Sequence, residues 1–248
     1  VRRLTAQSSV VRPGGSVTAD VVSELTASAE RAVHSTAVSC ACPQAGTVLA
    51  DRGGATVVRH GDVVAKAHAR GTDPAQLSLR VALAAHPALD GILLPPLSTE
   101  DTSVPDRLVT LWPHGSPVDP SDPERAPWEE AGALLARLHQ VDTAALPVPL
   151  PAMRGPTKAA RAVARLRTAV PHPGAAPVLR AWAELPAWAR AEAPMPPGRI
   201  LCHGDLHLGQ LVRLPSVGWR LIDVDDLGLG VPAWDLARPA ASFACGVL

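Results

Sequence analysis

The chain has 248 residues, 47% of them apolar, and a formal net charge of zero at pH 7. This size allows one domain or two small lobes around a cleft. The balanced charge excludes an overall electrostatic attraction to nucleic acid or to an anionic membrane, so we expect neither nucleic acid nor a membrane as a partner. Because no window approaches the ~20 continuous apolar residues of a membrane-spanning helix and the four cysteines are scattered, we expect a globular cytoplasmic protein, without a prediction of its oligomeric state.

The first predicted elements are a helix and three short strands. Residues 18–34 place apolar side chains on one helical face, and what this helix packs against is left open. His60-Gly61-Asp62 is typical of a hairpin turn between the second and third strands. Lys66 lies in the third strand, where it is either a solvent-facing residue of an edge strand or a ligand for phosphate. The period-two patterns predict these strands at residues 48–50, 55–59 and 63–67.

The middle of the chain predicts two helices separated by two strands. Asp73 is placed to cap a helix over residues 74–88, with a proline in its first turn. Residues 91–94 and 107–112 have the apolar character of strands. Residues 127–141 repeat apolar side chains at helical spacing, which predicts an amphipathic helix.

A basic stripe follows the amphipathic helix, with alanines between its charged residues. It consists of Lys158, Arg161, Arg165 and Arg167. Such a stripe is usually the solvated face of a helix, and this is how we interpret it. Binding of a phosphate group or of an acidic substrate is the alternative.

The strongest functional pattern lies in residues 200–226. An apolar run leads into a polar loop with Asp205, and Gln210 follows five positions later. A second apolar run then leads to Asp223 and Asp225. Phosphoryl transfer uses groups of this kind, because one carboxylate accepts the proton of the attacking hydroxyl while a carboxamide and a further carboxylate hold Mg²⁺.

Strand alternation adds a prediction about the aspartates that follow the second apolar run. Asp223 and Asp225 would lie on one side of an extended segment, so that both could face the metal. Asp226 would point away from them, and we interpret it as a loop cap.

Three short motifs stand out in residues 199–238. They are His203-Gly204-Asp205-Leu206-His207, Leu221-Ile222-Asp223 and Pro232-Ala233-Trp234-Asp235-Leu236-Ala237. They resemble the aminoglycoside phosphotransferase family, the small-molecule kinases that share the protein-kinase fold. The resemblance implies an α+β fold of two lobes: a nucleotide-binding lobe over residues 1–112, with a short antiparallel sheet and a helical extension over 1–45, and a mainly helical catalytic lobe over 113–248. Only eleven residues follow the third motif, so we expect the family's C-terminal helices to be missing.

The resemblance also implies ATP and Mg²⁺ as cofactors and gives each candidate residue a role. Asp205 is the expected catalytic base. Lys66 is expected to bind the α- and β-phosphates. Gln210, Asp223 and Asp225 are the expected metal ligands, although most family members carry Asn where this chain has Gln.

Further roles follow from the same resemblance. Leu111, Trp112 and Pro113 are the expected hinge between the lobes, where main-chain groups would face the adenine. Asp235 is expected to brace the catalytic loop and not to bind metal. The helix predicted over residues 74–88 departs from kinases in general, because it has no Glu to pair with the strand lysine.

The expected reaction is phosphorylation of a hydroxyl group on a small molecule, such as an aminoglycoside-like antibiotic, a sugar or an amino alcohol. A nucleotide-binding pseudokinase with a regulatory role is the alternative. The missing Glu and the Gln substitution favour it, while the presence of Asp205 and Asp223 counts against it. A metallohydrolase is a third interpretation, because His203, Asp205 and His207 alternate as metal ligands can. That interpretation leaves Asp223 and Asp225 without a role.

Overall fold

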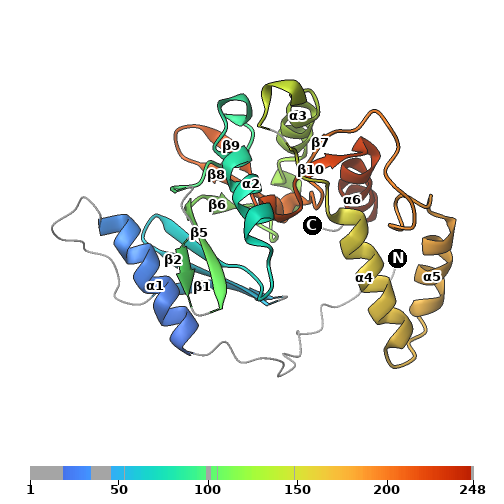
Figure 1. Ribbon diagram of the computed structural model, residues 1–248, viewed down its shortest axis with the longest axis horizontal. Helices are drawn as coiled ribbons and strands as arrows, with labels where there is room; N and C mark the ends of the chain where they lie inside the picture. Colours follow the sequence, from blue (N-terminus) through green and yellow to red (C-terminus); the bar gives the residue numbers. More distant parts are fainter. Residues whose placement is uncertain are drawn as a thin grey trace.

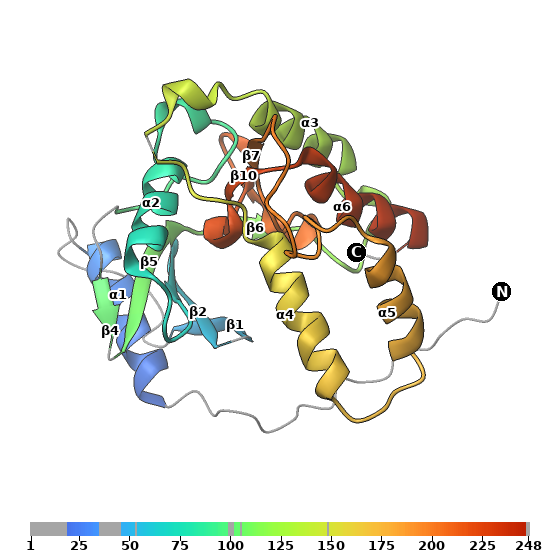
Figure 2. The ribbon, with the colours of Figure 1, turned by 45° about the vertical axis from the view of Figure 1, so that its right-hand side comes forward.

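The computed structural model describes residues 19–34, 46–52, 54–98, 102–104, 106–147 and 149–246. Figure 1 shows a sheet at one end, with α1 (Ala19–His34) against its outer face, and a mainly helical part at the other end. The helices α4 (Gly155–Thr168) and α5 (Ala175–Glu184) project together from the helical part, which the turned view of Figure 2 also shows. The predicted α+β fold with a small antiparallel sheet and a mainly helical second half is confirmed.

In the described part of the chain, five strands form the first sheet in the order β1-β2-β3-β5-β4, and all neighbours are antiparallel. Leu25 and Ala29 of α1 are buried against Val58, Ala65 and Val109 of this sheet. Removing these apolar side chains from water stabilises the packing of α1 on the sheet. The strands are β1 (Thr47–Arg52), β2 (Ala55–His60), β3 (Val63–Ala67), β4 (Thr102–Val104) and β5 (Arg107–Pro113).

The β2–β3 hairpin determines the position of Lys66. Its turn lies at His60-Gly61-Asp62 as predicted, and Gly61 has a φ of 56°, which glycine adopts without a side-chain clash. Lys66 pairs with Val57 of β2 on one side and with Thr110 of β5 on the other. Its strand is therefore interior to the sheet, and the edge-strand interpretation of Lys66 is wrong.

The helix α2 (Pro74–Ala84) begins where the sequence predicts and ends earlier. The side chain of Asp73 accepts the N–H of Gln76 at 3.2 Å and caps the first turn. The helix does not reach residue 88, because His86 adopts the extended conformation that is favoured before a proline. A short 3₁₀ turn at Pro87–Leu89 follows.

An arginine joins α2 to the second half of the molecule. Arg80 is 2% exposed, and its guanidinium donates to the carbonyl oxygen of Leu227 at 2.9 Å and to that of Ala152 at 3.0 Å. Hydrogen bonds from a charged donor of this kind are stronger than neutral ones. Arg80 thus connects α2 to the loop that follows Asp226. In kinases the corresponding helix instead provides a Glu that pairs with the strand lysine.

The prediction of a strand at residues 91–94 is wrong. Gly91 lies in a turn with a φ of 74°, and Leu93 forms a single parallel bridge with Leu221. Pro95 and Pro96 follow, and neither has the N–H group that a continuing ladder would need. The apolar residues of this segment are buried in the core of the second half instead.

The second half packs its helices around short strands. Leu134 and Leu138 of α3 are buried against Leu201, Leu211 and Leu221 in the larger of two apolar clusters, so the predicted amphipathic helix is confirmed. No helix in the described residues is long and apolar enough to cross a membrane. The elements are β6 (Ser116–Pro117), α3 (Trp128–His139), β7 (Ile200–Cys202), β8 (Leu211–Leu214), β9 (Gly218–Leu221), β10 (Gly228–Gly230) and α6 (Pro232–Cys245).

The first turn of α4 packs closely on α6. The indole N–H of Trp234 donates to the carbonyl oxygen of Gly204 at 2.9 Å. A Cβ atom on Gly155 would lie 2.1 Å from the indole nitrogen of Trp234 and 2.6 Å from the same Gly204 oxygen. Only a glycine lets the helix start this close to the loop after β7. This approach positions α4 beside Asp205.

Candidate active site

Lys66 and two aspartates from opposite halves of the chain meet at one place. The Nζ atom of Lys66 lies 2.7 Å from Oδ1 of Asp223 and 2.9 Å from Oδ2 of Asp225. The Nδ1 atom of His68, the residue directly after β3, lies 3.4 Å from Oδ1 of Asp225. The two aspartates together accept the lysine that kinases pair with a helix Glu.

A tight turn, and not strand alternation, brings Asp223 and Asp225 together. The strand β9 ends at Leu221, and Asp223 has the left-handed conformation with a φ of 63°. Asp tolerates this region better than most residues. A 3₁₀ turn at Val224–Asp226 follows, so the extended segment on which the alternation was argued does not exist.

The prediction that Asp226 is an outward-pointing loop cap is wrong. Its side chain is 3% exposed and contacts the Nζ atom of Lys158, and its Oδ1 atom lies 3.7 Å from Nε of Arg154. Burial raises the pKa of Asp226, and the nearby Lys158 and Arg154 partly offset this effect. Asp226 therefore joins the turn of the aspartates to α4.

The charges of the Lys66 cluster stabilise one another. Burial disfavours the charged form of each group, but the attraction between the ammonium and the carboxylates outweighs it. The result is a raised pKa for Lys66 and lowered pKa values for Asp223 and Asp225. The three groups stay ionised at neutral pH, so the two carboxylates already surround a cation.

Gln210 lies in the same cluster despite its extra methylene. It ends the 3₁₀ turn Leu208–Gln210, and its Nε2 atom donates to Oδ2 of Asp223 at 3.3 Å. The carboxamide and the carboxylates of Asp223 and Asp225 offer the hard oxygen donors that Mg²⁺ prefers. The donor chemistry of the site and the cation already held between its carboxylates both fit this metal.

Asp205 lies in the loop after β7 and is 31% exposed. Its Oδ2 atom lies 3.2 Å from the Nζ atom of Lys158, and its Oδ1 atom contacts the guanidinium of Arg238. Because Lys158 also contacts Asp226, one lysine connects Asp205 to the turn that carries Asp223 and Asp225. Sequence reasoning did not assign Lys158 or Arg238 to the site.

Asp235 of α6 fixes the backbone of this loop. Its two carboxylate oxygens accept the N–H groups of His203 and Gly204, each at 2.7 Å, and the ring of His139 lies 3.1 Å away. The Nε2 atom of His203 is 2.8 Å from the carbonyl oxygen of Ile222. Asp235 thus has the bracing position that the resemblance implied.

The metallohydrolase interpretation finds no support in these contacts. His203 is bound to a backbone carbonyl, and His207 accepts the N–H of Gly209 at 3.1 Å through its own ring. Among the described residues, the one group of three potential ligands within mutual reach is His139, Cys202 and Asp235. Asp235 has both oxygens engaged by backbone N–H groups, so we interpret this group as structural.

The predicted hinge residues continue β5 beside the strand of Lys66. Leu111, Trp112 and Pro113 pair with residues 63–65 of β3. The carbonyl oxygen of Leu111 accepts the N–H of Leu97 at 2.9 Å. The predicted hinge therefore lies next to the strand of Lys66. The contribution of its residues to nucleotide binding stays a prediction.

A pocket of about 900 Å³ opens beside Asp205. Its walls are α4, the segment after α5, and α6, and two tryptophans, Trp188 and Trp234, line it. The basic stripe of α4 contributes Lys158, Arg161 and Arg165 to the wall of this pocket. All three residues are exposed, so the predicted solvated face of the helix is also the face that borders the pocket. The alternative interpretation of the stripe, which is binding of a phosphate group or of an acidic substrate, is the part of the sequence analysis that indicates this pocket.

Comparison with known proteins finds solved structures with a similar fold. The aminoglycoside phosphotransferase APH(3'')-Id from Streptomyces rimosus is 23% identical, with 80% of this chain and 77% of that chain aligned and a TM-score of 0.56. The spectinomycin phosphotransferase APH(9)-Ia is 14% identical, with 77% and 67% aligned and a TM-score of 0.53. A thermostable mutant of APH(4)-Ia is 13% identical, with 78% and 71% aligned and a TM-score of 0.55.

These likenesses establish the fold, which is that of the kinase-like phosphotransferases. A search of curated protein sequences found no match. The sequence profile described as the phosphotransferase enzyme family matches residues 55–245, which is more than half of the chain. The chain therefore belongs to the phosphotransferase enzyme family, a family of kinase-type enzymes.

Proposed function

We propose that this protein transfers the γ-phosphoryl group of ATP to a hydroxyl group of a small molecule, in the cytoplasm. The observation that carries the proposal is the position of Asp205, which faces an open pocket on one side and is linked through Lys158 to the metal-site turn on the other. Further support comes from the relatives, one crystallised with ADP and spectinomycin and another with AMP-PNP and hygromycin B.

In the proposed reaction Asp205 accepts the proton of the acceptor hydroxyl. A carboxylate has about four lone-pair positions, so Asp205 retains free ones beside its contacts with Lys158 and Arg238. These two cations hold the carboxylate in place. Proton removal by a positioned carboxylate of this kind accounts for about 10²–10⁴ in rate.

The donor side of the reaction rests on Lys66 and the aspartates. We propose that residues 1–112 form the nucleotide-binding lobe, 113–248 the catalytic lobe, and Leu111–Pro113 the hinge. Lys66 would contact the α- and β-phosphates. Asp223, Asp225 and Gln210 would hold Mg²⁺, which neutralises charge on the phosphates when it is bound.

Acceptor-dependent release of ADP tests the proposed function. The full chain is incubated with Mg-ATP and a panel of sugars, amino alcohols, antibiotics and hydroxy acids, and ADP is measured against a sample without acceptor. At least one acceptor class should raise ADP release about tenfold or more above the background. Tight binding of ATP without any acceptor-dependent turnover would support the pseudokinase alternative instead.

Asp223→Asn is expected to weaken the binding of nucleotide with Mg²⁺ by about tenfold or more, and to change Mg²⁺-free binding much less. The variant removes an anionic oxygen donor from the metal, and even indirect partners of a bound metal are worth about 10–100-fold in affinity. Titration of ADP with and without Mg²⁺ measures both effects.

The exposed Asp62→Asn, in the β2–β3 turn, is the matched control for this substitution. It removes the same charge outside the site and should leave both titrations unchanged. Equal losses for Asp223→Asn with and without Mg²⁺ would mean that Asp223 only positions Lys66.

A further inference from the structure

The pocket beside Asp205 has more positive than negative side chains. Among the described residues that line it, the charged ones are Lys158, Arg161 and Arg165 of α4, Arg238 of α6, and Asp205. Lys158 and Arg238 already contact Asp205 and offset its charge. The pocket therefore offers an excess of positive potential to whatever it binds.

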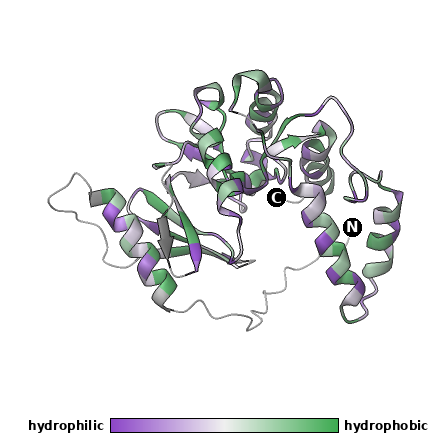
Figure 3. Ribbon diagram, in the orientation of Figure 1, coloured by the Kyte–Doolittle hydropathy of each residue, from purple (hydrophilic) through white to green (hydrophobic). Residues whose placement is uncertain are grey.

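The three cations of α4 lie along one face of the helix. Arg161 follows Lys158 by three positions, and Arg165 follows Arg161 by four, and residues at these spacings are neighbours on a helix surface. Figure 3 shows hydrophilic and hydrophobic bands alternating along this helix. Like charges at such spacings repel each other and destabilise the helix.

No described carboxylate compensates the two arginines of this face. Neither Arg161 nor Arg165 has an ion-pair partner among the residues that the structure describes, whereas Lys158 has two. A bound anion would remove the repulsion and would meet two planar guanidinium groups, which bind carboxylate and phosphate through paired hydrogen bonds.

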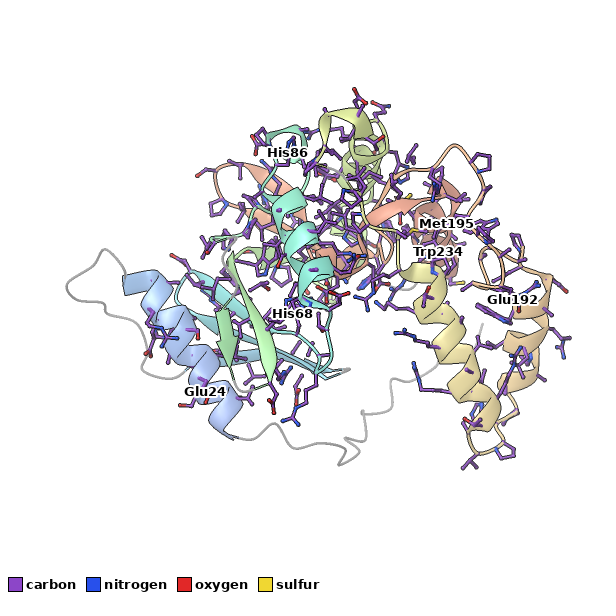
Figure 4. All side chains as sticks on the ribbon, viewed as in Figure 1. Glu24, His68, His86, Glu192, Met195 and Trp234 are labelled. Atoms are coloured by element: carbon purple, nitrogen blue, oxygen red, sulfur yellow. The ribbon has the colours of Figure 1, made fainter. Side chains whose placement is uncertain are left out.

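An apolar wall completes the pocket. Trp188 and Trp234 meet edge to face, with ring centroids 6.4 Å apart, and both are partly exposed. Figure 4 places the labelled Trp234 beside the first turn of α4. Exposed indole faces favour a ligand with a ring or another apolar surface.

From these features we infer that the acceptor is a hydroxylated organic anion. Its ring or apolar body lies against the two tryptophans, its carboxylate or phosphate group binds Arg161 and Arg165, and its hydroxyl reaches Asp205. The inference rests on the proposed function, because it identifies the acceptor class of the same reaction. A polycation such as an aminoglycoside would meet like charge in this pocket, which disfavours it as the acceptor.

Binding of matched probes to the ADP-loaded full chain tests this inference by calorimetry. One set shares the pyranose ring: glucose, glucuronate, glucose 6-phosphate and glucosamine. A second set shares a benzene ring: benzyl alcohol and 4-(hydroxymethyl)benzoate. In at least one set the anion should bind about tenfold or more tightly than its neutral counterpart, and added salt should weaken only the anion. Glucuronate and glucose 6-phosphate distinguish a carboxylate from a phosphate preference.

Arg165 is the residue to change, because Arg161 also lines a neighbouring pocket with Asp225 and a change there could alter nucleotide binding. Arg165→Gln should weaken the preferred anion about tenfold, since a hydrogen bond between charged partners is lost. Arg165→Glu should weaken it further. Both should leave ADP affinity unchanged. Arg167→Gln removes the same charge from the same helix outside the pocket lining and is the matched control.

The outcomes separate this inference from the proposed function. If in both sets a neutral or cationic probe binds as tightly as the matching anions, or if no anion binds, the inference is overturned. Turnover of a neutral or cationic acceptor in that case leaves the phosphotransferase function intact. Anion binding that depends on Arg165, without turnover of any acceptor, would support the anion site and contradict the phosphotransferase function.

Discussion

Asp205→Asn is expected to lower kcat for acceptor phosphorylation by at least ~10², while the affinity for Mg-ADP stays within about twofold of the wild type. The asparagine keeps the shape of the side chain but cannot take the proton of the hydroxyl. Asp205 is suited to this role because it is 31% exposed at the pocket, whereas its neighbour Asp226 is 3% exposed and is covered by α4.

The fold should tolerate this change. The contacts of Asp205 with Lys158 and Arg238 are on the surface, where ion pairs contribute about 0–1 kcal/mol. Thermal unfolding and ADP titration therefore serve as internal controls, and Asp62→Asn controls for the loss of a surface carboxylate. A variant that keeps kcat near the wild-type value would remove Asp205 from the mechanism.

The sequence predicted the site best where it is built from one continuous segment. Asp205, Gln210, Asp223 and Asp225 lie within residues 205–225, and the turns and strands between them are short. Lys66 comes from 157 positions before Asp223, so the composition of its own strand could not say which carboxylate it meets. The family resemblance implies a helix Glu as the partner of this lysine, which the chain lacks, so the pairing of Lys66 with Asp223 and Asp225 emerges only from the structure. The sheet register also excludes an edge position for Lys66.

Backbone conformation explains what the sequence missed near the aspartates. Strand alternation of the aspartates requires an extended chain after β9. Asp223 instead adopts the left-handed conformation and begins a 3₁₀ turn, which turns Asp226 into the protein beside Lys158. A run of three acidic residues with one valine among them contains no marker of that turn, since the glycine that usually signals a positive φ is absent from residues 223–226.

The basic face of α4 illustrates a different limit. A hydrophilic helix face has the same periodicity whether it meets solvent or lines a pocket. The distinction lies in residues far along the chain, because Trp188 and Trp234 close the pocket from the segment after α5 and from α6. Residues 91–94 show a related limit. Their apolar run could form a strand, but in the structure it is buried in the core and makes only a single bridge to β9.

Asp235 shows how much the active loop depends on a residue outside it. Its carboxylate is 1% exposed and accepts two backbone N–H groups of the loop at 2.7 Å, those of His203 and Gly204. It also lies beside the ring of His139. The loop has few other ways to satisfy these buried donors, so the conformation that presents Asp205 to the pocket depends on this one side chain.

Asp235→Ala is expected to lower the free energy of unfolding by about 3–5 kcal/mol, because each buried donor left without a partner costs ~1–3 kcal/mol. This is a large part of the ~5–15 kcal/mol that holds a typical domain folded. Urea titration measures the loss of unfolding free energy. Asp235→Asn retains one acceptor oxygen, so its loss should be smaller, and this variant replaces Asp235→Ala in the test if the alanine variant does not fold.

Asp90→Ala is the control, because Asp90 accepts one backbone N–H at 2.8 Å on the surface. Its loss of unfolding free energy should be about 1 kcal/mol or less. Equal urea midpoints for Asp235→Ala and Asp90→Ala would show that the loop keeps its conformation without the brace.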